Sequence, residues 1–325
     1  MKEEEIRPQK IFKEYLRLCE IDCHEYFDNA SFEVCVCPAC ENIGEFAFKK
    51  SGFTYKLCNL CETLFLSPRP YESAFSEYYI DAPSVKYWAT SFYKETAEAR
   101  REKIWKPKVR KVLDLIERYN AATFSIIDIG SGYGIFCEEM QKNISTSIIA
   151  IEPGPELANI CRKKGLKVVD KFLENVQLSD LSHGPKLFTS FELFEHLHSP
   201  KKFLKSLNLL MDSGDIFIFT TLSGTGVDIQ ALWEDSQSVS PPHHLNFFNP
   251  HSIKILLQKL GYKILEIGTP GELDIDILEN NQHLIKDRFW KTFIKNADKA
   301  KQKKWQTLIS QSGMSSHMMV CCQKL

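Results

Sequence analysis

The segment from Ser125 to Phe136 constrains the fold of this chain more than any other. A short apolar run that contains only one acid, Asp128, leads into three glycines at alternate positions, Gly130, Gly132 and Gly134. We expect a buried strand, a tight turn and the start of a helix. Glycine lets a backbone turn sharply and lets a ligand approach it closely, and a helix N-terminus offers free N–H groups. The pattern therefore predicts a nucleotide-binding turn.

Strand-like and helix-like segments alternate from residue 121 onward, which predicts a mostly parallel sheet with helices on both faces. Helices are expected between the strands, for example from Ser199 to Gly214, because a capping serine begins a helix and a glycine ends one. The fold class is therefore α/β and Rossmann-like. The expected strands cover residues 126–129, 147–152, 166–170, 186–193, 215–222, 262–267 and 318–323.

The glycine spacing does not by itself identify the nucleotide. A dinucleotide fingerprint has the form Gly-x-Gly-x-x-Gly, whereas this chain has Ile135 where that pattern requires its third glycine. Glu152 ends the second expected strand, 22 residues after Gly130. An acid at this place can accept hydrogen bonds from both ribose hydroxyls, which suits NAD and S-adenosylmethionine equally.

Four cysteines near the N-terminus have the spacing of a zinc site. Two Cys-x-x-Cys pairs, Cys37 with Cys40 and Cys58 with Cys61, are separated by 17 residues. Four thiolates would close the coordination sphere, so the expected zinc is structural, and it would supply folding energy to a module with little core of its own. Cys35 is an alternative ligand, and four reduced cysteines without a metal are the alternative interpretation.

Charge and hydropathy limit the partners of the chain. The chain has 325 residues and a net charge of −1, which disfavours nucleic acid as a partner. No apolar run reaches the roughly 20 residues that span a bilayer, so a membrane partner is not expected. Eleven cysteines without a signal peptide predict reduced thiols and a cytoplasmic location. The basic stretch 100–111 is interpreted first as a solvated helical face, and alternatively as an anchor for a phosphorylated substrate.

Several segments together resemble the motifs of class I S-adenosylmethionine-dependent methyltransferases. They are Asp128–Gly134, Ile151–Pro155, Phe191–Pro200 and Pro241–Phe248. The resemblance covers residues 121 to about 267 and implies a seven-stranded sheet whose last strand is antiparallel. The cysteine pairs followed by Ser67–Pro70 are similar to those of bacterial methyltransferases, many of which modify sugars, surface glycans or secondary metabolites.

The resemblance also implies which residues bind S-adenosylmethionine. The glycine turn would hold the methionine portion, and the end of the second strand would hold the ribose. Residues after the third strand would border the adenine, and residues after the fourth would lie beside the sulfonium. In chain order, these residues are Asp128, Gly130, Ser131, Gly132, Gly134, Glu152, Pro153, Phe172, Leu173, Phe191 and Glu192.

Three histidines are the candidate catalytic residues: His196, His243 and His244. A hydroxyl acceptor must lose a proton, and a histidine can take it near neutral pH. A structural cap for His196 and loop packing for the other two are the alternatives. The segment from Glu192 to His196, with Glu195 between them, also resembles the divalent-ion segment of ubiquinone-pathway O-methyltransferases, so a second metal remains open.

The expected organisation has three parts. Residues 1–70 would form an N-terminal helix and a zinc-binding module, residues 71–120 a helical linker, and residues 121–325 the methyltransferase domain. Within that domain, residues 272–316 would form a helical cap over the substrate, with an ordinary solvated decoration as the alternative. The predicted function is methyl transfer to a small-molecule acceptor, a sugar or metabolite hydroxyl or carbon. The alternatives are methylation of RNA or protein docked by the zinc module, and a non-catalytic binding or scaffold protein.

Overall fold

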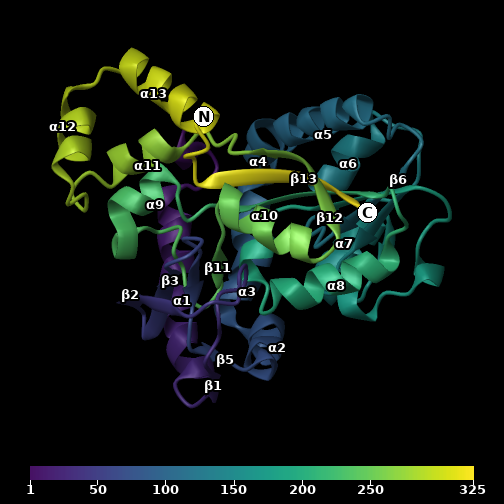
Figure 1. The fold of residues 1–325 in the computed structure, drawn as a ribbon, viewed down its shortest axis with the longest axis horizontal. Coiled ribbons are helices and arrows are strands. Elements are labelled where there is room, and N and C mark those ends of the chain that lie inside the picture. Colours follow the sequence, from purple (N-terminus) through teal and green to yellow (C-terminus); the bar gives the residue numbers. More distant parts are fainter.

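A seven-stranded sheet forms the centre of the molecule in the computed structural model, which describes all 325 residues. The strand order is β12-β13-β10-β9-β6-β7-β8 (Figure 1). β6 to β10 pair in parallel, whereas β13 pairs antiparallel with both β10 and β12, so the expected seven-stranded sheet with an antiparallel last strand is confirmed. The strands are β6 (Ser125–Ile129), β7 (Ile148–Ile151), β8 (Lys167–Val169), β9 (Lys186–Ser190), β10 (Ile216–Leu222), β12 (Tyr262–Gly268) and β13 (His317–Lys324).

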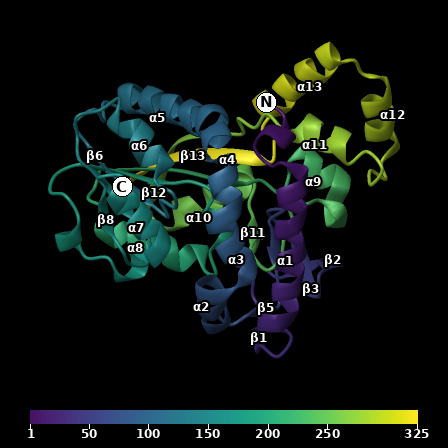
Figure 2. The same ribbon diagram turned by 180° about the vertical axis from the view of Figure 1, so that it is seen from behind.

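Helices cover both faces of this sheet (Figures 1 and 2). Successive strand residues point to opposite faces, so Ile127 packs in the hydrophobic cluster of α8 and α10, while Ile126 packs in the cluster of α5 and α6. The core is therefore divided by the sheet into two layers, as expected for an α/β fold. The helices are α5 (Lys106–Arg118), α6 (Ile135–Gln141), α7 (Pro155–Lys163), α8 (Pro200–Leu210) and α10 (Pro250–Lys259).

The expected helix after Ser199 begins where the sequence indicates but ends earlier. The Ser199 hydroxyl accepts a hydrogen bond from the Lys202 amide, which caps α8. The helix ends at Leu210 rather than near Gly214, and the fourth strand ends at Ser190 rather than at residue 193. A left-handed backbone at Glu192, with φ 55°, turns the chain out of the sheet and explains the shorter strand.

The cysteine pairs lie in a second sheet with the order β11-β4-β3-β2. β11 comes from Asn246–Phe247 and pairs with β4, so one strand of this sheet is supplied by a segment more than 150 residues later in the chain. The predicted division at residue 70 stays a prediction. The remaining elements of the region are α1 (Gln9–Phe27), β1 (Phe32–Glu33), β2 (Gly44–Lys50), β3 (Phe53–Cys58), β4 (Leu64–Leu66) and β5 (Arg69–Pro70).

Residues 72–118 form a nearly continuous helical path over the glycine turn. It consists of α2 (Glu72–Asp81), α3 (Pro83–Tyr87), a π-helical segment (Trp88–Phe92), α4 (Tyr93–Arg100), a second π-helical segment (Arg101–Trp105) and α5. The interpretation of residues 100–111 as a solvated face holds only in part, because Arg100 and Lys108 are each 7% exposed.

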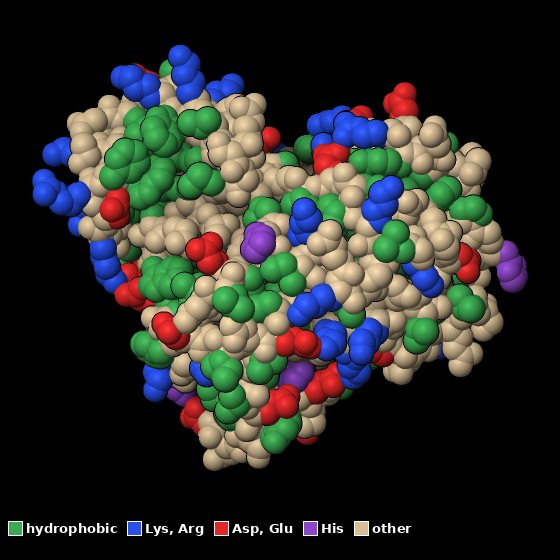
Figure 3. Space-filling view, viewed as in Figure 1, with side chains coloured by type: hydrophobic (Ala, Val, Ile, Leu, Met, Phe, Trp, Pro, Cys, Tyr) green, Lys and Arg blue, Asp and Glu red, His purple; other side chains and the backbone are tan.

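Three helices lie between β12 and β13, namely α11 (Asp274–Asn280), α12 (Arg288–Asn296) and α13 (Lys299–Gln311). Together with α9 (Val227–Leu232) they form a lobe that is joined to the N-terminus, where the Glu3 amide donates to Asp276 Oδ2 at 2.7 Å (Figure 1). Figure 3 shows hydrophobic side chains gathered on this lobe with basic side chains around them. A helix long and apolar enough to cross a bilayer does not occur.

Candidate active site

The three glycines of the turn have left-handed backbones but different surroundings. Their φ angles are 73° at Gly130, 53° at Gly132 and 68° at Gly134, a region that favours glycine. A Cβ atom on Gly130 would lie 2.9 Å from Leu193, and one on Gly134 would lie 2.7 Å from Leu166. A Cβ on Gly132 would meet nothing within 4 Å. Gly132 therefore borders open space, which is where a ligand could lie against the backbone.

Glu152 is connected directly to this turn. Its carboxylate accepts hydrogen bonds from the amides of Gly132 at 2.8 Å and Gly154 at 2.9 Å. Burial raises the pKa of Glu152, and the two amides act against that rise. A carboxylate oxygen has two lone pairs, so both oxygens retain capacity for ribose hydroxyls. Pro153 follows directly and leads into α7.

Asp128 lies at the base of the turn and is buried. Its carboxylate accepts a hydrogen bond from Thr189 Oγ1 at 2.7 Å and a weaker one from Cys137 Sγ at 3.5 Å. Burial raises the pKa of Asp128 to about 6, and the hydrogen bonds limit the rise. The side chain thus joins β6 to β9 and α6. The Ser131 hydroxyl donates to the main-chain oxygen of Asp128 and closes the turn.

Glu192 is the charged group at the end of β9. Lys108 Nζ lies 2.8 Å from its Oε1, and the Thr220 hydroxyl donates to the same oxygen at 2.9 Å. Burial acts to raise the pKa of Glu192, but Lys108 and His317 hold it well below its usual range. Its left-handed φ places it among the strained residues that cluster at functional sites. The neighbouring Phe191 packs edge-on against Phe136 of α6.

The two residues predicted to border the adenine face different ways. Phe172 is 58% exposed, whereas Leu173 is buried in the core cluster on the α8 side of the sheet. Both follow β8, at the carboxyl edge of the parallel strands, where open α/β sheets bind ligands. Only Phe172 has a surface that a ligand could cover.

Two of the three predicted histidines converge with an acid. Ligand atoms of Glu195, His196 and His244 all lie within 4.8 Å of one another. His244 Nδ1 lies 2.6 Å from the Ser238 carbonyl oxygen, so Nδ1–H donates there and Nε2 is left as an acceptor. Burial lowers the pKa of His196 to about 4 and that of His244 to about 3, so both rings are neutral at pH 7.

Glu195 is the acid of this cluster and is 2% exposed. Its Oε2 has no hydrogen-bond partner. Burial, followed by the charge of Glu192, raises the pKa of Glu195 to about 8. At neutral pH the carboxyl therefore carries a proton that it can donate to a neighbouring imidazole.

His243 lies apart from its neighbour's cluster. Its Nε2 is 2.6 Å from the Tyr78 hydroxyl and 3.3 Å from Cys19 Sγ, and the ring packs against Tyr15. Burial holds the pKa of His243 well below its usual range. These contacts agree with the loop-packing alternative for His243.

Two residues that position the site have no signal in the sequence. Lys108, within the basic stretch, pairs with Glu192, and Tyr55 of β3 donates its hydroxyl to the His244 carbonyl at 2.8 Å. The Leu245 amide also donates to the Glu195 carbonyl at 2.9 Å. The histidine loop is therefore held by the sheet that contains the cysteine pairs, a contact between distant segments that only the fold reveals.

A sequence model described as a methyltransferase domain matches residues 96–267, which is more than half of the chain. The chain belongs to this family. It is an S-adenosylmethionine-dependent methyltransferase, in agreement with the turn and the motifs that follow it. No curated protein sequence matches the methyltransferase.

Solved structures that are similar to the methyltransferase cover most of its length. A S-adenosylmethionine-dependent methyltransferase from Thermotoga maritima has 14% identity and a TM-score of 0.47, with 72% of this chain and 97% of that chain covered. The plantazolicin methyltransferase BpumL, in complex with S-adenosylhomocysteine, has 13% identity and a TM-score of 0.48, with 77% and 93% covered. The [4+2]-cyclase SpnF has 14% identity and a TM-score of 0.40, with 65% and 80% covered.

The four predicted zinc ligands of the methyltransferase converge. The Sγ atoms of Cys37, Cys40, Cys58 and Cys61 all lie within 4.8 Å of one another. The Cys40–Cys58 distance is 3.4 Å and the Cys37–Cys61 distance is 3.5 Å. In each pair, the residue after the second cysteine has a left-handed backbone, so the two turns have matching geometry. Cys35 lies outside the cluster, with its Sγ 3.7 Å from the Glu33 carbonyl oxygen.

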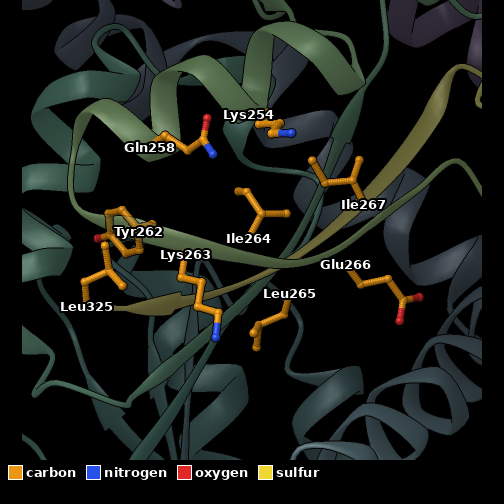
Figure 4. Close-up of a pocket in the computed structure, with 9 residues that line it drawn as sticks. All are labelled: Lys254, Gln258, Tyr262, Lys263, Ile264, Leu265, Glu266, Ile267 and Leu325. Atoms are coloured by element: carbon orange, nitrogen blue, oxygen red, sulfur yellow. The ribbon is translucent and has the colours of Figure 1, made fainter.

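A surface hollow lies along β12, the edge strand of the main sheet (Figure 4). Lys254 and Gln258 of α10 line one side of it, and Lys263 to Ile267 of β12 line the other. None of the predicted cofactor-binding or catalytic residues lines this hollow, so it is separate from the glycine turn and the histidine cluster.

Proposed function

We propose that this methyltransferase transfers the methyl group of S-adenosylmethionine to a hydroxyl or carbon of a small-molecule acceptor, such as a sugar or metabolite. The observation that carries the proposal is the convergence of Glu195, His196 and His244 beside Glu192, at the carboxyl end of β9. A neutral imidazole next to the expected sulfonium is what an acceptor hydroxyl needs, because it must lose its proton as it attacks.

In this proposal the donor lies along the carboxyl edge of β6, β7 and β8. Gly130, Ser131, Gly132 and Gly134 hold its methionine portion, supported by Asp128. Glu152 and Pro153 hold the ribose, and Phe172 borders the adenine, whereas the predicted Leu173 is buried and packs in the core. Phe191 and Glu192 lie beside the sulfonium, where an aromatic face and a carboxylate stabilise positive charge. Two observations support this arrangement: the open space beside Gly132, and the Glu152 carboxylate, which accepts hydrogen bonds from two backbone amides at the turn.

The reaction itself is an in-line displacement. The acceptor oxygen, or a carbanion carbon, attacks the methyl carbon while the carbon–sulfur bond breaks and its electron pair returns to sulfur. For a hydroxyl, the proton moves to Nε2 of His244 or to the unprotonated ring nitrogen of His196. Alignment of acceptor, methyl and sulfur supplies much of the acceleration. His243 was predicted as a third candidate, but its contacts with Tyr78 and Cys19 support a packing role.

A divalent ion at the same cluster is the second candidate arrangement. The predicted set was Glu192, Glu195 and His196, but Glu192 is paired with Lys108, and His244 takes its place in the cluster. His244 donates its Nδ1–H to a backbone carbonyl, an arrangement common for metal-bound histidines. Activity that survives dialysis against a chelator would favour the proton-acceptor role, and activity restored only by a divalent ion would favour the metal.

The cysteine cluster fits structural zinc. A tetrahedral ion with Zn–S bonds of about 2.3 Å places neighbouring sulfurs about 3.8 Å apart, slightly more than the distances between these Sγ atoms. When bound, zinc would tie Cys37 and Cys40 to Cys58 and Cys61 and leave no open coordination position. Because the same sheet holds the His244 loop through Tyr55, we propose that the module supports the active site rather than docking RNA or protein.

Substitution of the two clustered histidines tests the proposed reaction. His196→Asn and His244→Asn are expected to lower transfer of labelled methyl groups to a panel of sugars and metabolites by about 100-fold or more, the usual contribution of a general base. Donor affinity, measured by calorimetry, is expected to stay unchanged. His183→Asn, at an exposed histidine, is the control. Full transfer by both active-site variants would contradict the proposal.

A further inference from the structure

Buried N–H groups without an acceptor occur at three places in the chain. Ten buried side-chain nitrogen or oxygen atoms have no hydrogen-bond partner, and the three nitrogens among them are Arg7 Nε, Arg100 Nε and Trp105 Nε1. A buried donor without an acceptor costs roughly 1–3 kcal/mol, and more for a charged group. Such a group in a native protein calls for an explanation, and an acceptor on a bound molecule is one.

Arg100 differs sharply from the other deeply buried arginine. Arg69 is 3% exposed and fills its donors with the carbonyls of Leu66 and His198 and the side chain of Asn246. Arg100 is 7% exposed, donates no hydrogen bond and forms no ion pair with an acid. Its guanidinium lies only against aromatic rings, 5.8 Å from the centre of Trp88 and 5.4 Å from that of Tyr93. A buried charge of this kind needs a counter-charge.

Arg7 and Trp105 lie in the same neighbourhood as Arg100. Arg7 lies over the ring of Phe12, 5.5 Å from its centre, and Phe12 contacts Phe92. Phe92 in turn stacks on Trp88, the ring against which Arg100 lies. Burial lowers the pKa of Arg7, Glu3 acts against that change, and the charge of Arg100 adds to it. The pKa of Tyr93 is raised by burial, and both Arg100 and Trp105 act against that rise from beside its hydroxyl. All three unpartnered donors are thus grouped around one region.

The acids near these donors are largely committed elsewhere. Glu192 is paired with Lys108 at 2.8 Å. Glu3 forms an ion pair with Arg7, with 3.8 Å between the carboxylate and the guanidinium, but accepts no hydrogen bond from it. Burial and the neighbouring Asp274 raise the pKa of Asp228, and no ion pair joins Asp228 to Arg7 or Arg100. Arg100 is therefore the cation of this region that lacks an acid of its own.

This region adjoins the donor site. Tyr93 stacks on Tyr133 of the glycine turn, with ring centres 4.5 Å apart and planes 7° apart. The π-helical segments Trp88–Phe92 and Arg101–Trp105 flank α4 on both sides, and such segments occur often at functional sites. Arg100, the last residue of α4, therefore lies against a ring that itself stacks on the glycine turn.

We propose that Arg7, Arg100 and Trp105 bind an anionic group, a carboxylate or a phosphate, of a molecule held in the active site. The proposal rests on the proposed function, because it assigns the group to the donor or the acceptor of methyl transfer. A guanidinium and an indole N–H offer the donors that such oxygen atoms accept. Two sources share this chemistry, namely the amino-acid carboxylate of S-adenosylmethionine and an acidic acceptor such as a phosphorylated sugar.

Calorimetry with three probes tests the proposal and distinguishes the sources. S-adenosylmethionine carries the carboxylate, 5′-methylthioadenosine has the same nucleoside without the amino acid, and inorganic phosphate represents an acidic acceptor. The variants are Arg100→Gln, Arg100→Lys and Arg7→Gln. Arg110→Gln is the control, because Arg110 is exposed and its side chain has no polar partner. Arg7 precedes α1 outside both sheets, so its variant remains informative if Arg100→Gln fails to fold.

If the anionic group is the carboxylate of S-adenosylmethionine, Arg100→Gln and Arg7→Gln should bind S-adenosylmethionine at least tenfold more weakly. 5′-Methylthioadenosine should then bind as it does to the wild type. If the anionic group belongs to the methyl acceptor, both nucleosides should bind as they do to the wild type, and phosphate affinity should fall at least tenfold. Arg100→Lys is expected to recover part of either loss because it keeps the charge. Wild-type affinities for all three probes in both glutamine variants would overturn the proposal. Normal 5′-methylthioadenosine binding in that case would leave the proposed donor site intact.

Discussion

An alanine at position 132 would have two effects: strain in the left-handed backbone, and a methyl group in the space where the donor is expected to lie. Gly132→Ala places its methyl group in open space, so we expect about 1 kcal/mol of lost stability from the backbone alone and at least a tenfold loss of S-adenosylmethionine affinity. Calorimetry and urea unfolding measure the two effects separately.

Gly184→Ala provides the matched control. Gly184 has a φ of 84° and also meets nothing within 4 Å, but it lies just before β9, at the opposite end of that strand from the donor site. It should lose similar stability and keep the donor affinity of the wild type. Equal donor affinity in the two alanine variants would show that Gly132 does not face the ligand.

Asp128 is expected to make stability depend on pH. Its folded pKa of about 6 lies above the ordinary 3.8, so the folded state binds its proton more tightly than the unfolded state. The contribution is fully present below the unfolded pKa and is lost as pH rises through the folded pKa. Between pH 5 and pH 8, the free energy of unfolding of the wild type should fall by about 1 kcal/mol relative to Asp128→Asn. Parallel pH profiles from urea unfolding would contradict this assignment.

The place of a residue can be predicted where one local pattern determines the geometry. The convergence of the four cysteines and the position of Glu152 directly after β7 are examples, because spacing and strand ends are visible in the sequence. Their roles as zinc and donor ligands stay predictions. His243 and His244 show the limit. They are adjacent and identical, yet one packs on Tyr78 and the other joins Glu195, since partners from distant segments decide the direction of each ring.

The two turns that contain the cysteine pairs are expected to depend on zinc for their stability. Removal of the expected zinc with a chelator should lower the melting temperature by about 10 °C or more, because the turn before β2 and the turn between β3 and β4 would lose their crosslink. Methyl transfer should fall with it, since Tyr55 of β3 holds the His244 carbonyl.

Two cysteine variants check the same point without a chelator. Cys58→Ser should reproduce the loss of stability and the loss of zinc measured by atomic emission. Cys35→Ser should behave as the wild type, because its thiol lies outside the cluster. A protein that contains no zinc, and is as stable after Cys58→Ser as before, would refute a structural metal.

Helices and strands could be predicted from the sequence where periodicity and capping residues agreed. They were harder to predict where contacts with distant segments determine their bounds. The strands β6, β7 and β10 and the start of α8 follow the sequence closely. The bounds of α11 depend on such contacts, because its first residue, the buried Asp274, accepts hydrogen bonds from Ser315 and Gln306. Ser315 lies just before β13 and Gln306 lies in α13, so these partners are not visible in the local pattern.

At the scale of the whole molecule, the lobe of α11, α12 and α13 is the least explained part. We expect it to act as a cap, because α11 binds the N-terminal segment that carries Arg7. Replacement of residues 286–304 by a short linker should abolish methyl transfer and leave S-adenosylmethionine binding unchanged. Undiminished transfer without these residues would reduce the lobe to a surface decoration.

The architecture of the main sheet could be predicted because alternating strands and helices permit few arrangements. The joining of the N-terminal module to the rest could not, because β11 has only two residues and no pattern that marks it as a strand of a second sheet. That pairing makes the cysteine module and the histidine loop one structural unit, although almost 200 residues separate them in the chain.

The glycine turn and Glu152 are expected to bind S-adenosylmethionine. Calorimetry on the wild type and on Glu152→Gln tests this binding most directly. We predict that the wild type binds S-adenosylmethionine with one site and gives no heat with NAD. Glu152→Gln should bind the donor about tenfold more weakly, the equivalent of about 1.4 kcal/mol. Binding of NAD without S-adenosylmethionine, or wild-type donor affinity in Glu152→Gln, would contradict the account.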